Sequence, residues 1–180
     1  HGTTFTHQDL VRGPIHLPGD MVGDFVLLRQ DGSPVYNFCC AIDDAEMGIT
    51  HVLRGEEHLS NTLRQSMIYQ ALDLQAPIFG HLSLILGSDG KKLSKRTGAQ
   101  SVGEFKTQGF LPEALLNYLA LLGWSDPEHR EILSMQELIK AFQVDRLNPA
   151  APMFDVQNAS GSTRSTSNCA LMRGYGQRLP

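Results

Sequence analysis

Four cationic side chains lie close together in the segment GSDGKKLSKRTG, residues 87–98: Lys91, Lys92, Lys95 and Arg96. This cluster stands out in a mildly acidic chain, which has 15 Lys and Arg residues, 19 Asp and Glu residues and a formal net charge of −4. Flanking glycines let a backbone approach a ligand closely. Flexible lysines can neutralise phosphates and stabilise the charge on a departing pyrophosphate. A solvated run of charges is the alternative interpretation, and the loop lacks the Walker A pattern.

A parallel sheet with crossover helices is the expected framework for this loop. Short apolar runs of β-type residues predict three strands, at 24–29, 50–55 and 78–86. The stretches between them predict two helices, within 33–48 and 60–74. Alternating strands and helices are typical of an α/β fold with parallel strands. In such sheets ligands bind at the carboxyl ends of the strands, where Arg54 and the loop after Leu86 are expected.

Local signals predict where these two helices begin and end. Ser33 and Pro34 suit the N-cap and the first position of the first helix, and Gly48 suits its stop. Ser60 suits the cap of the second helix.

From about residue 101 the pattern contains helices only. Two capping boxes are expected, Ser101 with Glu104 and Ser134 with Glu137. Pro112 suits the first position of a helix that stops at Gly123. The last stretch is rich in Ser, Thr, Asn and Gly and has the composition of a linker or a disordered tail. The expected organisation is a partial nucleotide-binding domain, the basic loop, a helical unit and the tail, at residues 1–86, 87–100, 101–155 and 156–180.

The remaining composition excludes several classes of protein. The three cysteines, Cys39, Cys40 and Cys169, show no CxxC spacing and suit a reducing compartment. No histidine pair has metal-ligand spacing, so no protein-bound metal is expected. No apolar run is long enough for a membrane span, and the start lacks a signal-peptide pattern. The missing initiator methionine predicts a piece of a longer chain.

The pentapeptide KLSKR, residues 92–96, resembles the KMSKS signature loop of class I aminoacyl-tRNA synthetases. Longer stretches strengthen this resemblance and narrow it to glutamyl-tRNA synthetases of the bacterial and organellar kind. They are DFVLLRQDGSPVYNFCCAIDDAEMGITHVLRGEEHLSNTLRQSMIYQAL, HLSLILGSDGKKLSKRTG and GFLPEALLNYLALLGW. The resemblance covers roughly residues 9 to 155.

The resemblance implies a fold and a reaction. A Rossmann-type domain would activate L-glutamate with ATP, accompanied by Mg²⁺, and pass the adenylate to tRNA(Glu), with tRNA(Gln) as a second candidate. A helical unit that contacts the tRNA stem would follow the signature loop. The protein would be a monomer, acting in a bacterial cytoplasm or an organelle and not at a membrane.

The resemblance also implies roles for individual residues. Lys95 and Lys92 would be catalytic, and an ATP site would comprise Lys92, Leu93, Ser94, Lys95, Arg96, Leu84 and Ile85. Glutamate would be bound by Tyr36, Arg54 and Glu57. The chemistry fits, since Arg54 offers a two-pronged donor for a carboxylate and Tyr36 a neutral hydroxyl donor. The alternatives are a core tyrosine at Tyr36 and a structural ion pair of Arg54 with a neighbouring glutamate.

Departures from the family pattern limit the expectation for this chain. The HIGH-type signature, the first half of the nucleotide fold and the anticodon-binding domain are absent, so an internal fragment that is inactive alone is expected. Leu93 and Arg96 replace Met and Ser of the name-giving signature, a form familiar in glutamate enzymes. Two rivals stay open: a non-catalytic tRNA-binding module, and the related enzyme that attaches glutamate to a modified tRNA base. The lysine loop and the helical unit match the full synthetase better than that paralogue.

Overall fold

A computed structural model describes residues 4–87, 89–93 and 101–154. The chain divides into two compact units, residues 1–82 and residues from 83 onward. Each unit is described by itself. The predicted tail at 156–180 lies outside the described residues.

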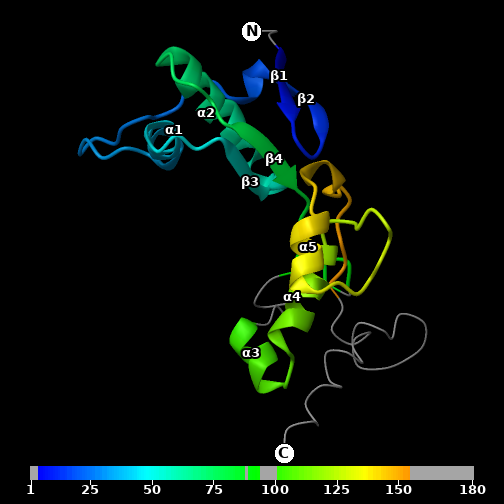
Figure 1. The fold of residues 1–180 in the computed structure, drawn as a ribbon. Coiled ribbons are helices and arrows are strands. Elements are labelled where there is room, and N and C mark those ends of the chain that lie inside the picture. The colour runs from blue at the N-terminus through cyan, green and yellow to red at the C-terminus, as the bar shows by residue number, and fades with distance from the viewer. Residues whose placement is uncertain (1–3, 88, 94–100, 155–180) are drawn as a thin grey trace, which may run out of the picture. The chain divides into compact units, whose positions relative to one another are not determined.

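The first unit opens with an antiparallel hairpin (Figure 1). Strands β1 (Thr4–Asp9) and β2 (Gly13–Pro18) pair from Thr4 opposite Pro18 to Asp9 opposite Gly13. Gly13 has a φ of 72°, which suits glycine at the end of the tight turn. The sequence analysis did not predict this hairpin, and the short helix η1 (Gly19–Met21) follows it.

The centre of the first unit is a parallel strand pair joined by a helix. Strand β3 (His51–Gly55) leads through η2 (Glu56–His58) and helix α2 (Leu59–Ala71) to β4 (Ile78–Leu82). The strands are parallel, so the predicted α/β fold with parallel strands is confirmed. Strand β4 ends at Leu82, short of the predicted end at residue 86.

The predicted strand at 24–29 is wrong. Only Leu28 in this stretch makes a β-bridge, with Pro34, across a turn through Gly32. Proline has no N–H to donate and cannot extend a ladder. The apolar run therefore leads into a turn, and Val26 and Leu28 stay more than half exposed.

Helix α1 (Tyr36–Glu46) confirms the predicted helix but not its cap. The N-cap is Val35, because the Ser33 amide and hydroxyl both donate to Asp31 in the preceding turn. Gly48 has a φ of 66°, as the predicted stop requires. Ser60 is likewise not a cap: α2 starts at Leu59, with His58 before it. The core between α1, α2 and the strands is formed by Ala41, Ile68, Tyr69 and Phe79.

The regular elements described in the second unit are helices: α3 (Val102–Thr107), α4 (Pro112–Leu121), α5 (Met135–Ala141) and η4 (Val144–Arg146). Both predicted capping boxes are present at α3 and α5, and Pro112 opens α4 as predicted. One core gathers Phe105, Phe110, Leu115 and Phe154, and another Trp124, Leu133 and Leu138. Among the helices that the structure describes, none is long and apolar enough to cross a membrane.

Candidate functional site

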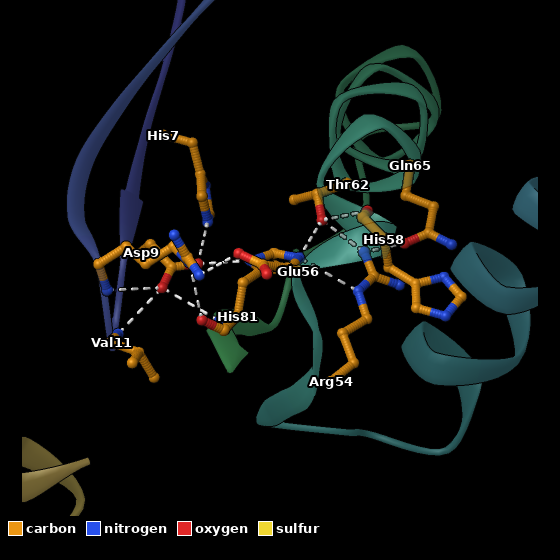
Figure 2. A network of polar contacts seen from close by, with 10 residues as sticks. His7, Asp9, Val11, Arg54, Glu56, His58, Thr62, Gln65 and His81 are labelled. Carbon is orange, nitrogen blue, oxygen red and sulfur yellow. Dashed lines mark hydrogen bonds and ion pairs between the residues drawn. The ribbon is translucent and has the colours of Figure 1, made fainter. Parts of the chain in front are cut away.

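The site in the first unit starts from the ends of two neighbouring strands. Arg54 on β3 and His81 on β4 are register partners in the parallel pair, one residue before each strand ends. Their side chains therefore meet on one face, and Arg54 Nε lies 3.3 Å from His81 Nε2. Figure 2 shows the two side chains between α2 and the N-terminal hairpin.

Helix α2 holds the Arg54 guanidinium from the other side. Arg54 Nη2 donates to Thr62 Oγ1 at 2.5 Å and to Gln65 Oε1 at 2.9 Å. Thr62 and Gln65 are three positions apart on α2, so they share a face, and both are buried. The guanidinium carbon also lies 5.0 Å from the ring centre of Phe79, within the range of a cation–π contact. A fixed cation results, since arginine does not lose its proton in proteins.

Tyr36 extends this group from the first turn of α1. Its hydrogen bond with Cys40 and its partial burial raise the pKa of Tyr36, while the nearby Arg54 guanidinium acts against them. Burial lowers the pKa of Arg54, and Tyr36, Cys40 and Asp44 oppose this shift. The tyrosine is 53% exposed, so it is not an ordinary core residue. The structure therefore brings Tyr36 and Arg54 together, with the tyrosine partly open to solvent.

Within the described part of the chain, the hydrogen-bond partners of Arg54 are the neutral side chains of Thr62, Gln65, His81 and Tyr36. The structural ion pair with a neighbouring glutamate, its alternative interpretation, is not among these contacts. Glu56 pairs with Arg12 of the hairpin.

Glu57, the third residue predicted to bind glutamate, follows β3 on the short helix η2. Its carboxylate lies over Gly55, where an added Cβ would stand 2.1 Å from Glu57 Oε2. The residue also lines a groove of about 300 Å³ with Leu17 and Leu63, and the residues around that groove include neither Tyr36 nor Arg54. The roles of Tyr36, Arg54 and Glu57 in glutamate binding stay predictions.

A buried polar network continues from Arg54 to the hairpin (Figure 2). Thr62 Oγ1 lies 2.8 Å from His81 Nε2, and His81 Nδ1 lies 2.5 Å from Asp9 Oδ2. The other oxygen of Asp9 accepts the backbone N–H groups of Val11, Arg12 and His81. The sequence analysis missed the network residues Asp9, Thr62, Gln65 and His81, although a histidine inside the apolar run IFGHLSLIL was a readable signal.

The electrostatics of the network follow from its burial. Burial lowers the pKa of His81, although Asp9 opposes the shift. Burial alone would raise the pKa of Asp9, but hydrogen bonds from His81 and from the backbone of Arg12 and Val11 outweigh it and lower that pKa. A neutral imidazole beside an ionised carboxylate is the resulting state at neutral pH.

The predicted ATP residues lie in the second unit and are described in part. Ile85 accepts the Leu93 N–H through its carbonyl oxygen, and Leu86 forms a bridge with Lys92. Between them the chain turns through Gly90, with Asp89 accepting the Lys91 N–H. This places Leu84 and Ile85 next to the start of the basic loop. Ser94, Lys95 and Arg96 lie outside the described residues.

In residues 4–87, 89–93 and 101–154, no cluster of three or more His, Cys, Asp or Glu side chains could hold a metal ion.

The arrangement defines a class of protein. A parallel β3–α2–β4 unit with a cation held at a strand end is characteristic of Rossmann-type ligand-binding folds.

Comparisons with known proteins identify the family. The model for "tRNA synthetases class I (E and Q), catalytic domain" matches residues 1–159. The glutamate–tRNA ligase of Bdellovibrio bacteriovorus is 59% identical over 151 residues, which are 84% of this chain and 31% of that protein. Glutamate–tRNA ligase 1 of Fervidobacterium nodosum is 59% identical over 145 residues, 79% of this chain and 31% of that protein. This chain therefore belongs to the class I tRNA synthetases for glutamate and glutamine.

Solved structures agree with this membership. A glutamate tRNA ligase from Elizabethkingia meningosepticum, crystallised in complex with its amino acid, superposes with a TM-score of 0.78 at 38% identity. The match covers 86% of this chain and 34% of that one. The glutamate–tRNA synthetase of Elizabethkingia anophelis gives a TM-score of 0.79 at 37% identity, over 87% and 35% of the two chains. The chain spans about a third of the length of the relatives it matches.

Proposed function

We propose that this chain is the part of a glutamate–tRNA ligase that binds the side chain of glutamate and carries the signature loop. The whole enzyme joins L-glutamate to ATP, releasing pyrophosphate, and transfers glutamate from the adenylate to tRNA(Glu). The observation that carries the proposal is the Tyr36–Arg54 pair, held at a strand end within a region 59% identical to a glutamate–tRNA ligase.

Glutamate recognition rests on charge and shape. The guanidinium of Arg54 is fixed through Nε and Nη2, and Nη1 takes no part in the bonds to Thr62, Gln65 and His81. That nitrogen, with the Tyr36 hydroxyl, is suited to a carboxylate of the substrate. A neutral glutamine side chain would gain less from the cation. Glu57 is the third proposed glutamate-binding residue, for example at the ammonium group.

ATP is assigned to the basic loop. Lys92, Leu93, Ser94, Lys95 and Arg96 would surround the phosphates, with Mg²⁺ arriving with ATP, and the backbone of Leu84 and Ile85 would face the adenine. Lys95 and Lys92 are the proposed catalytic groups. Charge on pyrophosphate develops in the transition state, so a lysine that meets it there raises kcat more than it strengthens ATP binding.

The helical unit at 101–155 is assigned to the tRNA stem, with 1–86 as the partial catalytic domain and 87–100 as the loop between them. The enzyme would act as a monomer in a bacterial cytoplasm or an organelle. tRNA(Gln) is the second candidate substrate.

Pyrophosphate exchange tests this function. Residues 4–154 would replace the matching segment of the Bdellovibrio bacteriovorus ligase, giving a complete enzyme. We expect glutamate-dependent exchange, and Lys95→Ala should lower its kcat by about 10²–10³-fold, the scale of one lost charge-stabilising donor. Lys91→Ala is the matched control and should be milder. No exchange from a folded chimera would favour the binding-module alternative, and a more damaging Lys91→Ala would contradict the loop assignment.

A further inference from the structure

A continuous chain of buried side chains links the N-terminal hairpin to the proposed glutamate-binding arginine. It runs from Asp9 on β1 through His81 on β4 to Thr62 on α2 and Arg54 on β3 (Figure 2). Asp9, Thr62 and His81 are at most 2% exposed. Three of the four segments are far apart in sequence, so only the folded chain assembles the network.

The positions of the protons follow from the donors and acceptors. Arginine nitrogens can only donate, so His81 Nε2, 3.3 Å from Arg54 Nε, must be an acceptor. The histidine proton must then be on Nδ1, from which it is donated to Asp9 Oδ2. Thr62 accepts from Arg54 Nη2, and its hydroxyl proton has two acceptors in reach, His81 Nε2 at 2.8 Å and the His58 carbonyl oxygen at 3.3 Å. With either acceptor, the bonds to Arg54 Nε and Asp9 Oδ2 are satisfied when His81 is neutral and protonated at Nδ1.

We propose that Asp9 and His81 are positioning residues for glutamate binding: Asp9 holds His81 in the Nδ1–H tautomer, and His81 with Thr62 holds the Arg54 guanidinium in its substrate-binding orientation. The inference rests on the proposed function, in which Arg54 binds the substrate carboxylate. The same logic, a carboxylate fixing the tautomer of a histidine that acts through its other nitrogen, recurs in catalytic and metal sites.

The charged surroundings support this arrangement. Arg12 donates to the His81 carbonyl oxygen and pairs with Glu56, and His7 Nε2 lies 3.9 Å from Asp9 Oδ2. Arg12 and Arg54 both disfavour a protonated His81, as does burial. Asp9 is held by three backbone N–H groups, so it cannot turn away from His81 without losing them.

The geometry makes Asp9→Asn a sharp test. The three backbone N–H groups would keep the amide oxygen at the position of Oδ1, so the amide NH₂ would face His81 Nδ1. His81 would then have to accept at Nδ1 and carry its proton on Nε2, directly opposite the Arg54 Nε–H. The substitution is isosteric, yet it reverses the tautomer and sets two donors against each other.

The first experiment reads the tautomer in the 180-residue chain itself. Long-range ¹H–¹⁵N NMR spectra distinguish a protonated Nδ1 from a protonated Nε2 in a neutral imidazole. We expect Nδ1–H for His81 at pH 7.5 and Nε2–H in Asp9→Asn, with a shifted Arg54 Nε–H resonance. An Nε2–H or charged His81 in the unsubstituted chain would overturn the proposal without need of any variant.

The second experiment measures affinity in the complete chimeric ligase. Asp9→Asn should raise the KM for glutamate by about 10–100-fold, the usual scale for a supporting partner, and leave the KM for ATP within about 3-fold. Thr62→Val should act in the same direction, and Thr62→Ser, which keeps the hydroxyl, should restore most of the loss. Asp31→Asn, an exposed turn aspartate that also accepts two hydrogen bonds, is the matched control.

The outcomes separate this inference from the proposed function. An unchanged glutamate KM in a folded Asp9→Asn enzyme would overturn the positioning role. An unchanged glutamate KM in Arg54→Gln would instead refute the assignment of Arg54 to the substrate, and with it the positioning role, while the NMR result would stand as a property of the fold.

Discussion

Two buried aspartates, one in each unit, use an arginine in opposite ways. Asp126 in the second unit accepts both Nε and Nη2 of Arg130, four residues along, and the N–H groups of Glu128 and Arg130. Asp9 in the first unit reaches Arg54 only through His81 and Thr62, across 45 residues of sequence. Asp126 closes a local loop with a partly exposed arginine, whereas Asp9 orients an arginine at a strand end. The Asp126–Arg130 pair stabilises the fold locally, whereas the network that starts at Asp9 supports the proposed binding site.

The shift in the pKa of Asp126 agrees with this contrast between the two aspartates. The hydrogen bonds from Arg130 lower the pKa of Asp126 to about 2. Arg130 also lies within ion-pair distance of Glu128 and Glu137, so three carboxylates of the fold surround its charge. In the first unit Asp9 neutralises no arginine directly, so the charge of Arg54 stays available to a substrate.

Replacing each arginine should give the largest difference between the two units. In the complete ligase, Arg54→Gln should lower kcat/KM for glutamate by about 10²–10³-fold, because a charge-assisted pair with the substrate is lost. Arg130→Gln should leave kcat/KM within about 3-fold and reduce thermal stability. Pyrophosphate exchange and melting curves of both variants measure this. Equal losses of kcat/KM in Arg54→Gln and Arg130→Gln would contradict the different roles given to the two arginines.

Removing each aspartate should give the next largest effect. Asp9→Ala leaves His81 Nδ1 and three backbone N–H groups without their acceptor, at a cost of about 3 kcal/mol in the free energy of unfolding. Asp126→Ala should cost less, since Arg130 can turn toward water. Urea denaturation of the 180-residue chain compares the two. A larger loss for Asp126→Ala would contradict the account.

Glycine substitutions test how tightly the hairpin packs against β4. A Cβ on Gly80 would stand 2.7 Å from Leu53 Cδ2 and 3.3 Å from Leu10 Cβ, whereas one on Gly123 meets nothing within 4 Å. Gly80→Ala should cost about 1–2 kcal/mol by pushing Leu10 and the adjoining Asp9 away from β4. Gly123→Ala should stay within about 0.5 kcal/mol. Melting curves measure the loss of stability in both variants. If Gly80→Ala leaves the stability unchanged, the hairpin is not tightly packed against β4.

The pH dependence of stability should differ between the units by a smaller amount. Burial lowers the pKa of His7 and His81, so the unfolded chain binds protons that the folded chain does not. The first unit should lose stability as the pH falls below 6.5, by at most about 1.4 kcal/mol per pH unit for each histidine. Asp126 has a lowered pKa and should lose its contribution only between about pH 4 and pH 2.

Separate probes can follow the two units in one titration. Trp124, the single tryptophan, reports the second unit, and NMR signals of buried Tyr69 report the first. Urea midpoints from both probes at pH 7.5 and 5.5 would test the prediction. A first unit that is equally stable at both pH values would rule out neutral, buried histidines.

The sequence predicted what local patterns determine. Length and periodicity identified α1 and α2 although both predicted N-caps were wrong, and capping signals identified the helices of the second unit. The parallel β3–β4 pair followed from the order of strands and helices. The strand at 24–29 failed because apolar composition does not reveal whether a partner strand exists, and the hairpin was missed because its polar strand THQD lacks an apolar face.

The site shows the same limit. Tyr36 and Arg54 were found through the resemblance to the family, but Asp9 and His81 meet only through tertiary contacts between β1 and β4. Glu57 came from the same resemblance, and its role in glutamate binding stays a prediction. Sequence spacing predicts neighbours along an element and not across a sheet.

A crystal structure of the complete chimeric ligase with bound glutamate would test the central claim most directly. The account predicts that a carboxylate oxygen of glutamate lies within about 3.2 Å of an Arg54 nitrogen, while Arg54 keeps its bonds to Thr62 and His81. Glutamate bound away from Arg54, or an Arg54 that has left Thr62 and His81 to reach it, would contradict the account.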